Sequence, residues 1–387
     1  MVKSKKNSYS DLTNFLYQEL AWGPFFKKQD GKYIKNMDND SSIYIKESLK
    51  IMKIKISDLK NKKVFNIGTG RESRFFAKYG ADVTHLDIGS ETVKELRKWS
   101  KKNNKNINSF TSDIEKADIG HNKYDLIFLS GIYQHIKVPA LSLIKFINSL
   151  KKNGIMYMGF YRSGEFKYFI VDSIRYLLNK SDLFKVRNLN SILFTQCDFY
   201  NYQSSRVMDD FFVPKKHNFH PKDVINDIKT LGSKVIYIKK DFRNYSHKGS
   251  SYFSIGGDRI YIKKTTDKIF FEKDVKKKLK TYQGINQILD LRYKHKIIKE
   301  NISLIKKIKI LKIKKKITKE DIIALCLGLY QFTRPINLEK SEYYYLTRKF
   351  GRHETINKYL KNFIKNFDQS KKENIKFNNK LTQLGLK

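Results

Sequence analysis

The feature that most constrains this chain is an alternation of short apolar runs with amphipathic segments between residues 64 and 161. The apolar runs have the length of buried strands and occupy residues 64–67, 83–86, 107–110, 124–129 and 154–161. Apolar residues with helical spacing lie between them, at residues 73–79, 91–99 and 140–150. Strands that alternate with helices form βαβ units, in which neighbouring strands run parallel. This region therefore predicts an α/β fold, with helices packed on a parallel sheet.

The chain beyond residue 161 predicts one more helix, two more strands and a helical tail. A long aromatic-rich stretch leads to Pro221, which suits the first position of a helix. Apolar runs at residues 234–238 and 259–262 predict two further strands, and no strand pattern follows residue 266. We therefore predict three regions: an N-terminal helical segment (1–44), an α/β domain (45–265) with an insert at about 162–220, and a basic, mainly helical C-terminal extension (266–387).

A glycine-rich turn follows the first predicted strand, in the sequence Val-Phe-Asn-Ile-Gly-Thr-Gly at residues 64–70. Glycines there let the backbone approach a ligand, and the helix that follows favours a polar or anionic group at its N-terminus. Asp87 ends the second strand, where a carboxylate can accept hydrogen bonds from both hydroxyls of a ribose. Asp113 follows the third strand, where it can meet an adenine amine. Asp87 as a helix cap and Asp113 as a turn residue are the alternatives, but their order together favours an adenosine-containing ligand.

These residues, with Leu-Ser-Gly-Ile-Tyr-Gln-His at 129–135, resemble class I S-adenosylmethionine (SAM)-dependent methyltransferases. The turn at residues 150–154 and the closing helix and strands at 221–264 are similar to the same family. The resemblance covers roughly residues 45–265. It implies a Rossmann-like, seven-stranded, mostly parallel sheet with helices on both faces, and SAM as the cofactor.

The resemblance also implies roles for individual residues. The cofactor would be bound by Asn66, Gly68, Gly70, Asp87, Asp113, Ile114, Ser130 and Gly131. Tyr133 and His135 would lie near the substrate. Two positions depart from the family pattern: Asn66 stands where Asp or Glu is usual, and Glu72 stands where a third glycine is usual. These departures leave open a degenerate fold that acts as a binding module.

Histidines are the natural candidates for a general base, because their pKa lies near the operating pH. We name His135, His217 and His220, with Tyr133, as catalytic candidates, and Asp209 and Asp210 as residues that orient them. A helix cap at His220 and a surface position for His217 are the alternatives. The same acids and histidines follow no established ligand motif, so we predict no metal site.

The net charge of +41 raises the possibility of a nucleic-acid partner. Most of the basic residues are lysine, a bias that an AT-rich genome alone produces. Arginine, the better residue for bidentate binding of phosphate and guanine, is scarce. We therefore expect a small-molecule or saccharide-type methyl acceptor. An RNA methyltransferase anchored by the basic C-terminal region is the alternative. A nicotinamide dehydrogenase is set aside, because position 73 is Ser where its glycine motif needs Gly.

The remaining composition points to an intracellular protein. Cys197 and Cys326 are too few and too far apart for a disulfide framework. No apolar run reaches the roughly 18 residues of a membrane span, and no secretory signal is visible at the N-terminus. We expect a cytoplasmic protein without a transmembrane segment. The sequence indicates neither the methylated atom nor the oligomeric state.

Overall fold

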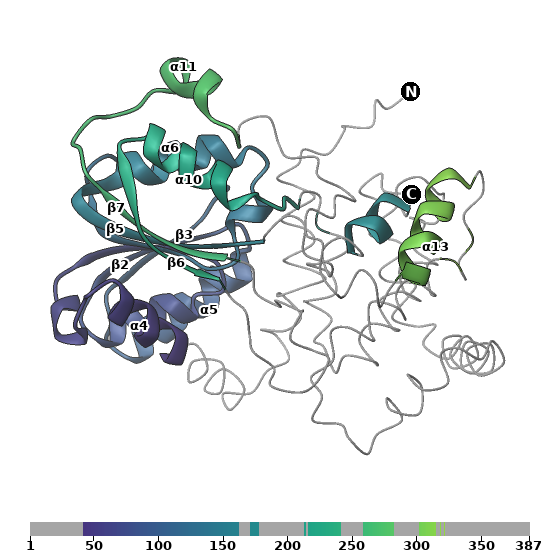
Figure 1. Cartoon of the computed structure of the whole chain (residues 1–387). Coiled ribbons are helices and arrows are strands. Elements are labelled where there is room, and N and C mark those ends of the chain that lie inside the picture. Colours follow the sequence, from purple (N-terminus) through teal and green to yellow (C-terminus); the bar gives the residue numbers. More distant parts are fainter. Residues whose placement is uncertain are drawn as a thin grey trace, which may run out of the picture.

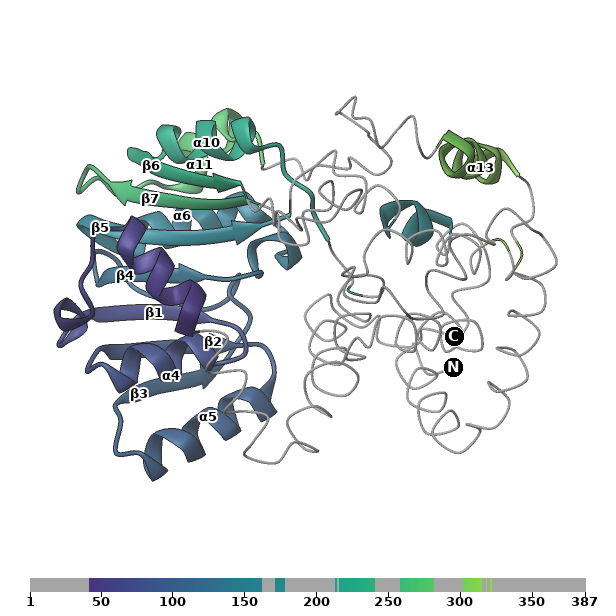
Figure 2. The same ribbon diagram turned by 60° about the horizontal axis from the view of Figure 1, so that its bottom comes forward.

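The computed structural model describes residues 42–161, 171–177, 213, 216–240, 258–281, 302–314, 318 and 321. Its centre is a seven-stranded sheet in the order β3-β2-β1-β4-β5-β7-β6. Figure 2 shows the strands in this order, from β3 at the bottom of the view to β6 near the top. The predicted α/β fold with a seven-stranded sheet is confirmed.

Every strand expected from the sequence is present. The strands are β1 (Lys63–Ile67), β2 (Asp82–Asp87), β3 (Ile107–Thr111), β4 (Tyr124–Leu129), β5 (Leu150–Phe160), β6 (Ser233–Lys240) and β7 (Asp258–Lys264). The pairs β1–β2, β2–β3, β1–β4 and β4–β5 are parallel, whereas β7 runs antiparallel to both β5 and β6. The sheet is therefore mostly parallel, as predicted.

Helices follow the strands at the predicted places. The α-helices are α4 (Arg71–Lys78), α5 (Ser90–Lys102), α6 (Pro139–Ser149), α10 (Pro221–Thr230), α11 (Glu272–Val275) and α13 (Ile302–Ile313). Short 3-10 helices are η2 (Ile56–Leu59), η3 (Tyr133–His135) and η5 (Lys276–Lys278). Residues 42–51 and 171–177 are also helical. Pro221 opens α10, because its fixed φ suits a helix start and its missing N–H is not needed there.

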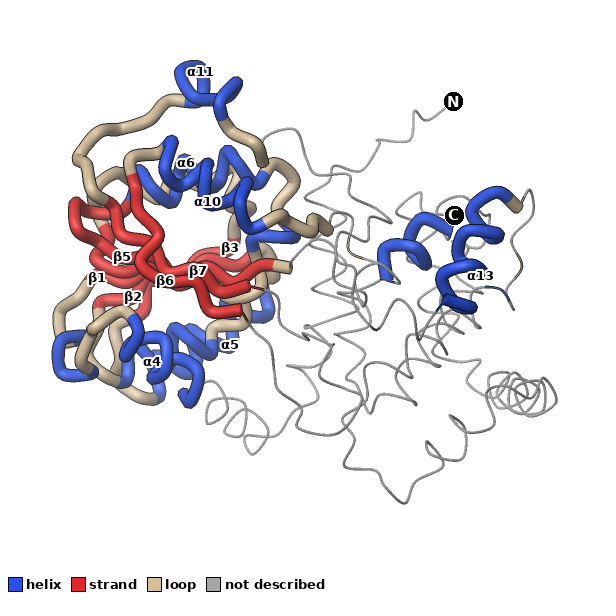
Figure 3. The backbone as a smooth tube through the Cα atoms, in the orientation of Figure 1, coloured by secondary structure: helices blue, strands red, loops and turns tan. Residues whose placement is uncertain are grey.

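Helices cover both faces of the sheet (Figure 1), and α4 and α5 lie on the face opposite α6 and α10. Figure 3 shows the strands enclosed between these two helical layers. The alternation of side chains along β1 divides the core: Val64 packs with the α4 side, whereas Phe65 and Ile67 pack with the α6 side. Burial on both faces explains why the parallel strands read as continuous apolar runs.

The packed domain extends beyond both limits expected for it. Residues 42–44 belong to the helix that packs on the α4 side, so the expected limit at residue 45 falls within a helix. After β7, the Asn148 amide exchanges two hydrogen bonds with the backbone of Phe270, at 2.8 and 2.9 Å. The Asp227 carboxylate accepts hydrogen bonds from the backbone of Lys280 and Thr281. Residues up to Thr281 thus pack on the α/β domain.

Several expectations fall on residues outside the described part of the chain. These are the N-terminal segment up to residue 41, most of the insert at 162–220 with Asp209 and Asp210, and most of the C-terminal extension.

Candidate functional site

The strand order reverses between β1 and β4, and ligands of such sheets bind outside the carboxyl ends of the strands at this switch point. The loop after β1 contains Gly68 at φ +121° and Gly70 at φ +78°, both in the left-handed region that favours glycine. A Cβ on Gly68 would lie 3.3 Å from the Cδ1 atom of Ile132, so the loops after β1 and β4 touch here. Gly70 is the N-cap of α4, whose first amides therefore border the switch point.

A chain of buried hydrogen bonds lies beneath the glycine loop. The Asn66 Nδ2 donates to the carbonyl of Phe128 at 2.7 Å, and the Ser73 hydroxyl donates to the Asn66 Oδ1 at 2.8 Å. The Ser73 oxygen also lies 2.9 Å from the His85 Nδ1. Since the single hydroxyl proton of Ser73 is used toward Asn66, we assign the proton of this contact to His85. We call Asn66, Ser73 and His85 the loop-support network.

The loop-support network is neutral and fully buried. Asn66, Ser73 and His85 each have an exposed fraction of 0%. Burial, with a smaller contribution from Arg74, lowers the pKa of His85 from 6.5 to about 3. Both ends of the Asn66 amide are occupied within the protein, although the family resemblance implied that this residue contacts the cofactor. The amide instead ties β1, β4 and α4 together below the loop.

Glu72, the second departure from the family pattern, turns toward the helix at residues 42–51. Its carboxylate accepts hydrogen bonds from the Tyr44 hydroxyl and, at 3.0 Å, from the Arg71 Nε. The guanidinium carbons of Arg71 and Arg259 each lie 5.9 Å from the centre of the Tyr44 ring. Burial and the neighbouring Glu72 raise the pKa of Tyr44 well above 10. The acid is thus paired within the protein.

Asp87 ends β2 beside the switch point. The Gly89 amide donates to its Oδ1 at 2.6 Å, and no donor to its Oδ2 lies within the described chain. Burial raises the pKa of Asp87 from 3.8 to about 7, and the Gly89 hydrogen bond opposes this shift only in part. A ligand that donates hydrogen bonds to this carboxylate would therefore stabilise its charged form.

Asp113 and Ile114 begin the turn after β3. The Asp113 Oδ1 accepts a hydrogen bond from the Glu115 amide at 2.9 Å, so this side chain has the turn role considered as an alternative. The Lys145 ammonium donates to the carbonyls of Ile114, Glu115 and Ala117 and holds the turn against α6. Ile114 is buried in the core on the α6 side.

The loop after β4 continues from Ser130 and Gly131 into η3. Gly131 is exposed and adopts φ +69°. Tyr133 is fully buried and packs on Phe219, with ring centres 4.8 Å apart. Its hydroxyl lies 3.3 Å from the Thr281 Oγ1, and burial raises its pKa. The structure therefore places Tyr133 in the core, although the resemblance implied a position near the substrate.

The structure brings two of the three candidate histidines together at the carboxyl ends of β4 and β5. His135 and His217 are both buried. The His217 amide donates to the Gln134 carbonyl at 2.8 Å, and the His135 ring meets the Tyr161 ring edge to face. His220 lies at the start of α10 as its N-cap, without a side-chain capping hydrogen bond.

A buried ion pair borders these histidines. The Lys216 Nζ lies 3.4 Å from the Asp172 Oδ1, and the Asn218 amide donates to the same carboxylate. Lys216 also lies over the Tyr161 ring, 5.4 Å from its centre. We call the whole set the acceptor-side cluster; its members are Gln134, His135, Tyr161, Asp172, Lys216, His217 and Asn218.

The α/β domain is similar to a known protein family. Residues 65–158 match the family model described as a methyltransferase domain, and the match includes the glycine loop, Asp87 and the loop after β4. The sheet order, with its antiparallel β7, agrees with this match. The chain contains a class I SAM-dependent methyltransferase domain.

Three solved structures are similar to this methyltransferase. A SAM-bound magnesium protoporphyrin IX methyltransferase from Synechocystis PCC 6803 is 10% identical, with 67% of this chain and 99% of that chain covered and a TM-score of 0.40. A putative sarcosine dimethylglycine methyltransferase from Galdieria sulphuraria is 13% identical, with 59% and 85% covered and a TM-score of 0.38. A SAM-dependent methyltransferase from Mesorhizobium loti is 10% identical, with 53% and 92% covered and a TM-score of 0.38. No curated protein sequence matches this chain.

The residues at the switch point fit SAM. The backbone of Gly68 and Gly70 and the first turn of α4 offer amides and close approach, and Asp87 presents a carboxylate where ribose hydroxyls bind in this kind of fold. The loop after β3 is fixed by Lys145 and leaves Asp113 at the same edge of the sheet. The paired state of Glu72 removes the objection that an isolated acid stands near the cofactor.

Some residues of the candidate site had no clear signal in the sequence. In the sequence, Ser73 served only to exclude the glycine motif of a dehydrogenase, and His85 had no assigned role. Asp172 and Lys216 pair across 44 positions of the sequence, so no local pattern connects them. Gln134 stood in the quoted motif, directly before His135, but only its burial in the structure distinguishes it.

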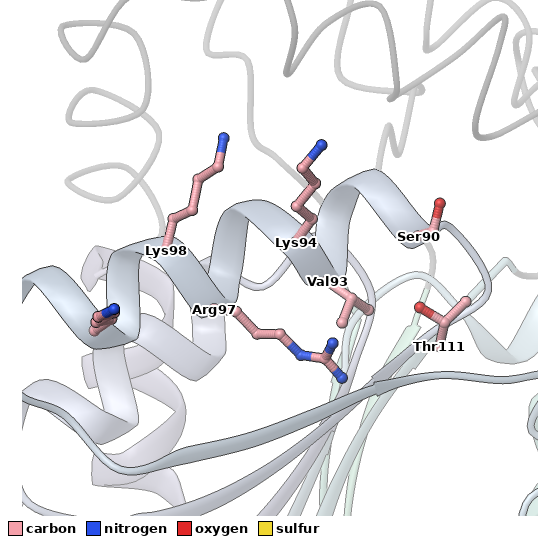
Figure 4. A pocket seen from close by; sticks show the side chains of 7 residues that line it. Ser90, Val93, Lys94, Arg97, Lys98 and Thr111 are labelled. Atoms are coloured by element: carbon pink, nitrogen blue, oxygen red, sulfur yellow. The ribbon is translucent and has the colours of Figure 1, made fainter.

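The methyltransferase also has a cationic groove on its surface, distinct from the acceptor-side cluster (Figure 4). It has a volume of about 480 Å³ and is lined by Ser90, Val93, Lys94, Arg97, Lys98, Lys101 and Thr111. Arg97 is used within the protein, because its guanidinium donates to the Ser109 carbonyl. Lys98 pairs with Glu95 at 2.8 Å. Lys94 and Lys101 project from the exposed side of α5.

Two possible features are absent from the described residues. No described helix is both long and apolar enough to cross a membrane. Within the same residues, no group of three or more His, Cys, Asp or Glu could hold a metal ion.

Proposed function

We propose that the methyltransferase transfers a methyl group to a hydroxyl oxygen of a small-molecule or saccharide-type acceptor. The observation that supports this proposal is the acceptor-side cluster. It gathers buried polar side chains at the carboxyl ends of β4 and β5, next to the loop that follows β4. Buried polar groups suit a compact, hydroxylated acceptor whose own polar groups complete their hydrogen bonds.

The residues of the site have separate roles in this proposal. When bound, SAM supplies an electrophilic methyl group. Gly68, Gly70 and Asp87 hold the cofactor, and the loop-support network keeps the glycine loop in place. His135 or His217 accepts the proton of the acceptor hydroxyl, since both lie within the cluster. The remaining requirement is alignment, because methyl transfer needs little more than a deprotonated acceptor oxygen in line with the methyl group.

Product formation tests the proposal directly. Full-length protein is incubated with SAM and a panel of mono- and oligosaccharides, small hydroxylated compounds and total RNA, and S-adenosylhomocysteine is measured. We expect turnover with a hydroxylated small molecule, loss of turnover in Asp87→Ala, and a lower kcat with unchanged cofactor affinity in His135→Ala or His217→Ala. Turnover only with acceptors that lack a hydroxyl group would contradict the proposal.

An RNA acceptor is the second candidate, and the cationic groove on α5 favours it. Lys94, Lys98 and Lys101 lie on one side of a single helix, as Figure 4 shows for Lys94 and Lys98. Phosphate binding by such residues makes affinity fall steeply with salt. If RNA is the acceptor, turnover on RNA drops between 50 and 200 mM salt, by about tenfold or more, and Lys94→Glu with Lys101→Glu abolishes it. The small-molecule proposal expects neither effect.

A further inference from the structure

Gln134 differs from the other buried amides of the methyltransferase. Its side chain has an exposed fraction of 0%, and within the part of the chain that the structure describes neither its Nε2 nor its Oε1 has a hydrogen-bond partner. Asn66 and Asn148 are also buried, but both ends of each amide are paired within the protein. Buried Asn218 has one end paired, because its Nδ2 donates to Asp172, whereas its Oδ1 has no partner among the described residues. Buried polar groups in native proteins almost always have partners, so each exception calls for a physical reason.

The position of Gln134 supplies that reason. It is the middle residue of η3, directly after the loop that leaves β4 at the switch point. A Cβ placed on Gly131 would lie 3.6 Å from the Gln134 Nε2, so the amide lies against this exposed glycine. The amide therefore borders the place where the β4 loop meets the acceptor-side cluster.

The neighbours of Gln134 fix it in place. Tyr133 is anchored in the core by Phe219, and the ring of His135 lies edge-on to Tyr161. The carbonyl of Gln134 itself accepts the amide of His217. Because the backbone is held on both sides and the side chain is fully buried, the amide has little freedom to lose when a ligand binds.

We propose that Gln134 is the residue that recognises the methyl acceptor, and that it binds two adjacent oxygens of a vicinal diol. A primary amide offers a donor and an acceptor side by side. One hydroxyl of the diol accepts a hydrogen bond from the Nε2, and its neighbour donates one to the Oε1. This inference rests on the proposed function and narrows it to acceptors with adjacent hydroxyl groups, as saccharides have.

The test compares matched acceptors on matched variants. Turnover by the full-length protein is measured with pairs of monosaccharides and their deoxy analogues, which lack one hydroxyl of a vicinal pair. We expect wild-type kcat/KM to be at least tenfold higher for the diol of a pair. In Gln134→Leu, which keeps the approximate size of the side chain, this preference disappears and kcat/KM for the diol falls at least tenfold.

Two further readouts separate recognition from a structural role. In Gln134→Leu, SAM affinity by calorimetry and the Tm are expected to stay unchanged or the Tm to rise, because an unpaired buried amide is removed. Asn148→Leu is the control, since it breaks a paired buried amide and is expected to lower the Tm without changing the preference for the diol. Gln134→Met repeats the experiment should the leucine variant fail to fold.

The possible outcomes distinguish failure of the role of Gln134 from failure of the proposed function. Turnover of hydroxylated acceptors without a preference for the diol, or with a preference that survives in Gln134→Leu, overturns the role of Gln134 and leaves the proposed function standing. A variant with weakened SAM binding and a lowered Tm shows a structural residue and also overturns the role. No turnover with any hydroxylated compound overturns both.

Discussion

The two sides of the switch point treat their buried polar groups differently. On the β1 side, Asn66, Ser73 and the His85 Nδ1 hydrogen-bond to one another beneath the glycine loop, and the buried His85 Nε2 has no partner among the described residues. On the β4 side, Gln134 is equally buried, but neither end of its side-chain amide has a partner among the described residues. A buried polar side chain can therefore have either of two roles. The paired amide of Asn66 supports the cofactor loop, whereas the unpaired amide of Gln134 leaves hydrogen-bonding capacity for a ligand.

Among the substitutions considered, Asn66→Asp should destabilise the loop-support network most. The carboxylate would face the Phe128 carbonyl at 2.7 Å without the amide donor, inside a fully buried network. We expect a loss of about 3–5 kcal/mol in the free energy of unfolding, as for an uncompensated buried charge. Urea unfolding at pH 7.5 measures it. Asn226→Asp, at an exposed position on α10, is the control and should change stability by less than about 0.5 kcal/mol. Equal stability of the two variants would contradict the loop-support network.

Acid weakens the same network through His85. Its folded pKa is lowered to about 3, so it stays neutral while the unfolded chain takes up a proton below pH 6.5. Stability is therefore complete above pH 6.5 and is lost as the pH falls toward 3. Between pH 7.5 and 4.5 we expect wild type to lose about 2–3 kcal/mol more than His85→Gln. His121→Gln, at an exposed histidine, should behave as wild type.

Asp87→Asn should change the stability of the protein and its affinity for SAM in opposite directions. Asp87 has its pKa raised to about 7, so ionisation between pH 4 and 7 destabilises the folded state. At pH 8 we expect the variant to be more stable by roughly 1–3 kcal/mol. Its SAM affinity should fall about 10–100-fold, because charge-assisted hydrogen bonds are lost.

The control for Asp87 is Asp118→Asn. Asp118 also accepts a hydrogen bond from a glycine amide two residues later, at 2.8 Å, but its side chain is exposed. Thermal unfolding and calorimetry on both variants give the two quantities. If Asp87→Asn binds SAM as wild type does, Asp87 is not the ribose ligand.

The smallest effect is expected for Tyr133→Phe. The hydroxyl pairs with the Thr281 Oγ1 at 3.3 Å, so its loss should cost about 0.5–1.5 kcal/mol of stability and leave kcat within twofold of wild type. Tyr124→Phe removes a buried hydroxyl that has no hydrogen-bond partner in the described part of the chain, and should not destabilise the fold. A drop in kcat beyond about 100-fold in Tyr133→Phe would restore the catalytic role that the sequence suggested.

The candidate site was predictable only where a local pattern encodes it. Gly68 and Gly70 follow a strand, and left-handed φ values at such a turn require glycine, so the pattern carries the geometry. Asp87 was predictable from its place at the end of β2. His135 and His217 were named for their chemistry alone. Their meeting depends on the hydrogen bond between the His217 amide and the Gln134 carbonyl, which joins residues 83 positions apart in the sequence.

Local sequence patterns specify the strands, the helices between them, the parallel pairing expected of βαβ units and the cofactor turn, because hydrophobic periodicity and turn residues act over a few neighbouring positions. Tertiary structure decided what the two unusual residues do. Asn66 became a paired buried amide and Glu72 a partner of Tyr44, through contacts with residues distant in sequence. It also left the Gln134 amide buried with no hydrogen-bond partner in the described residues. Whether a polar group is satisfied depends on which atoms packing brings within about 3 Å, and no local pattern contains that information.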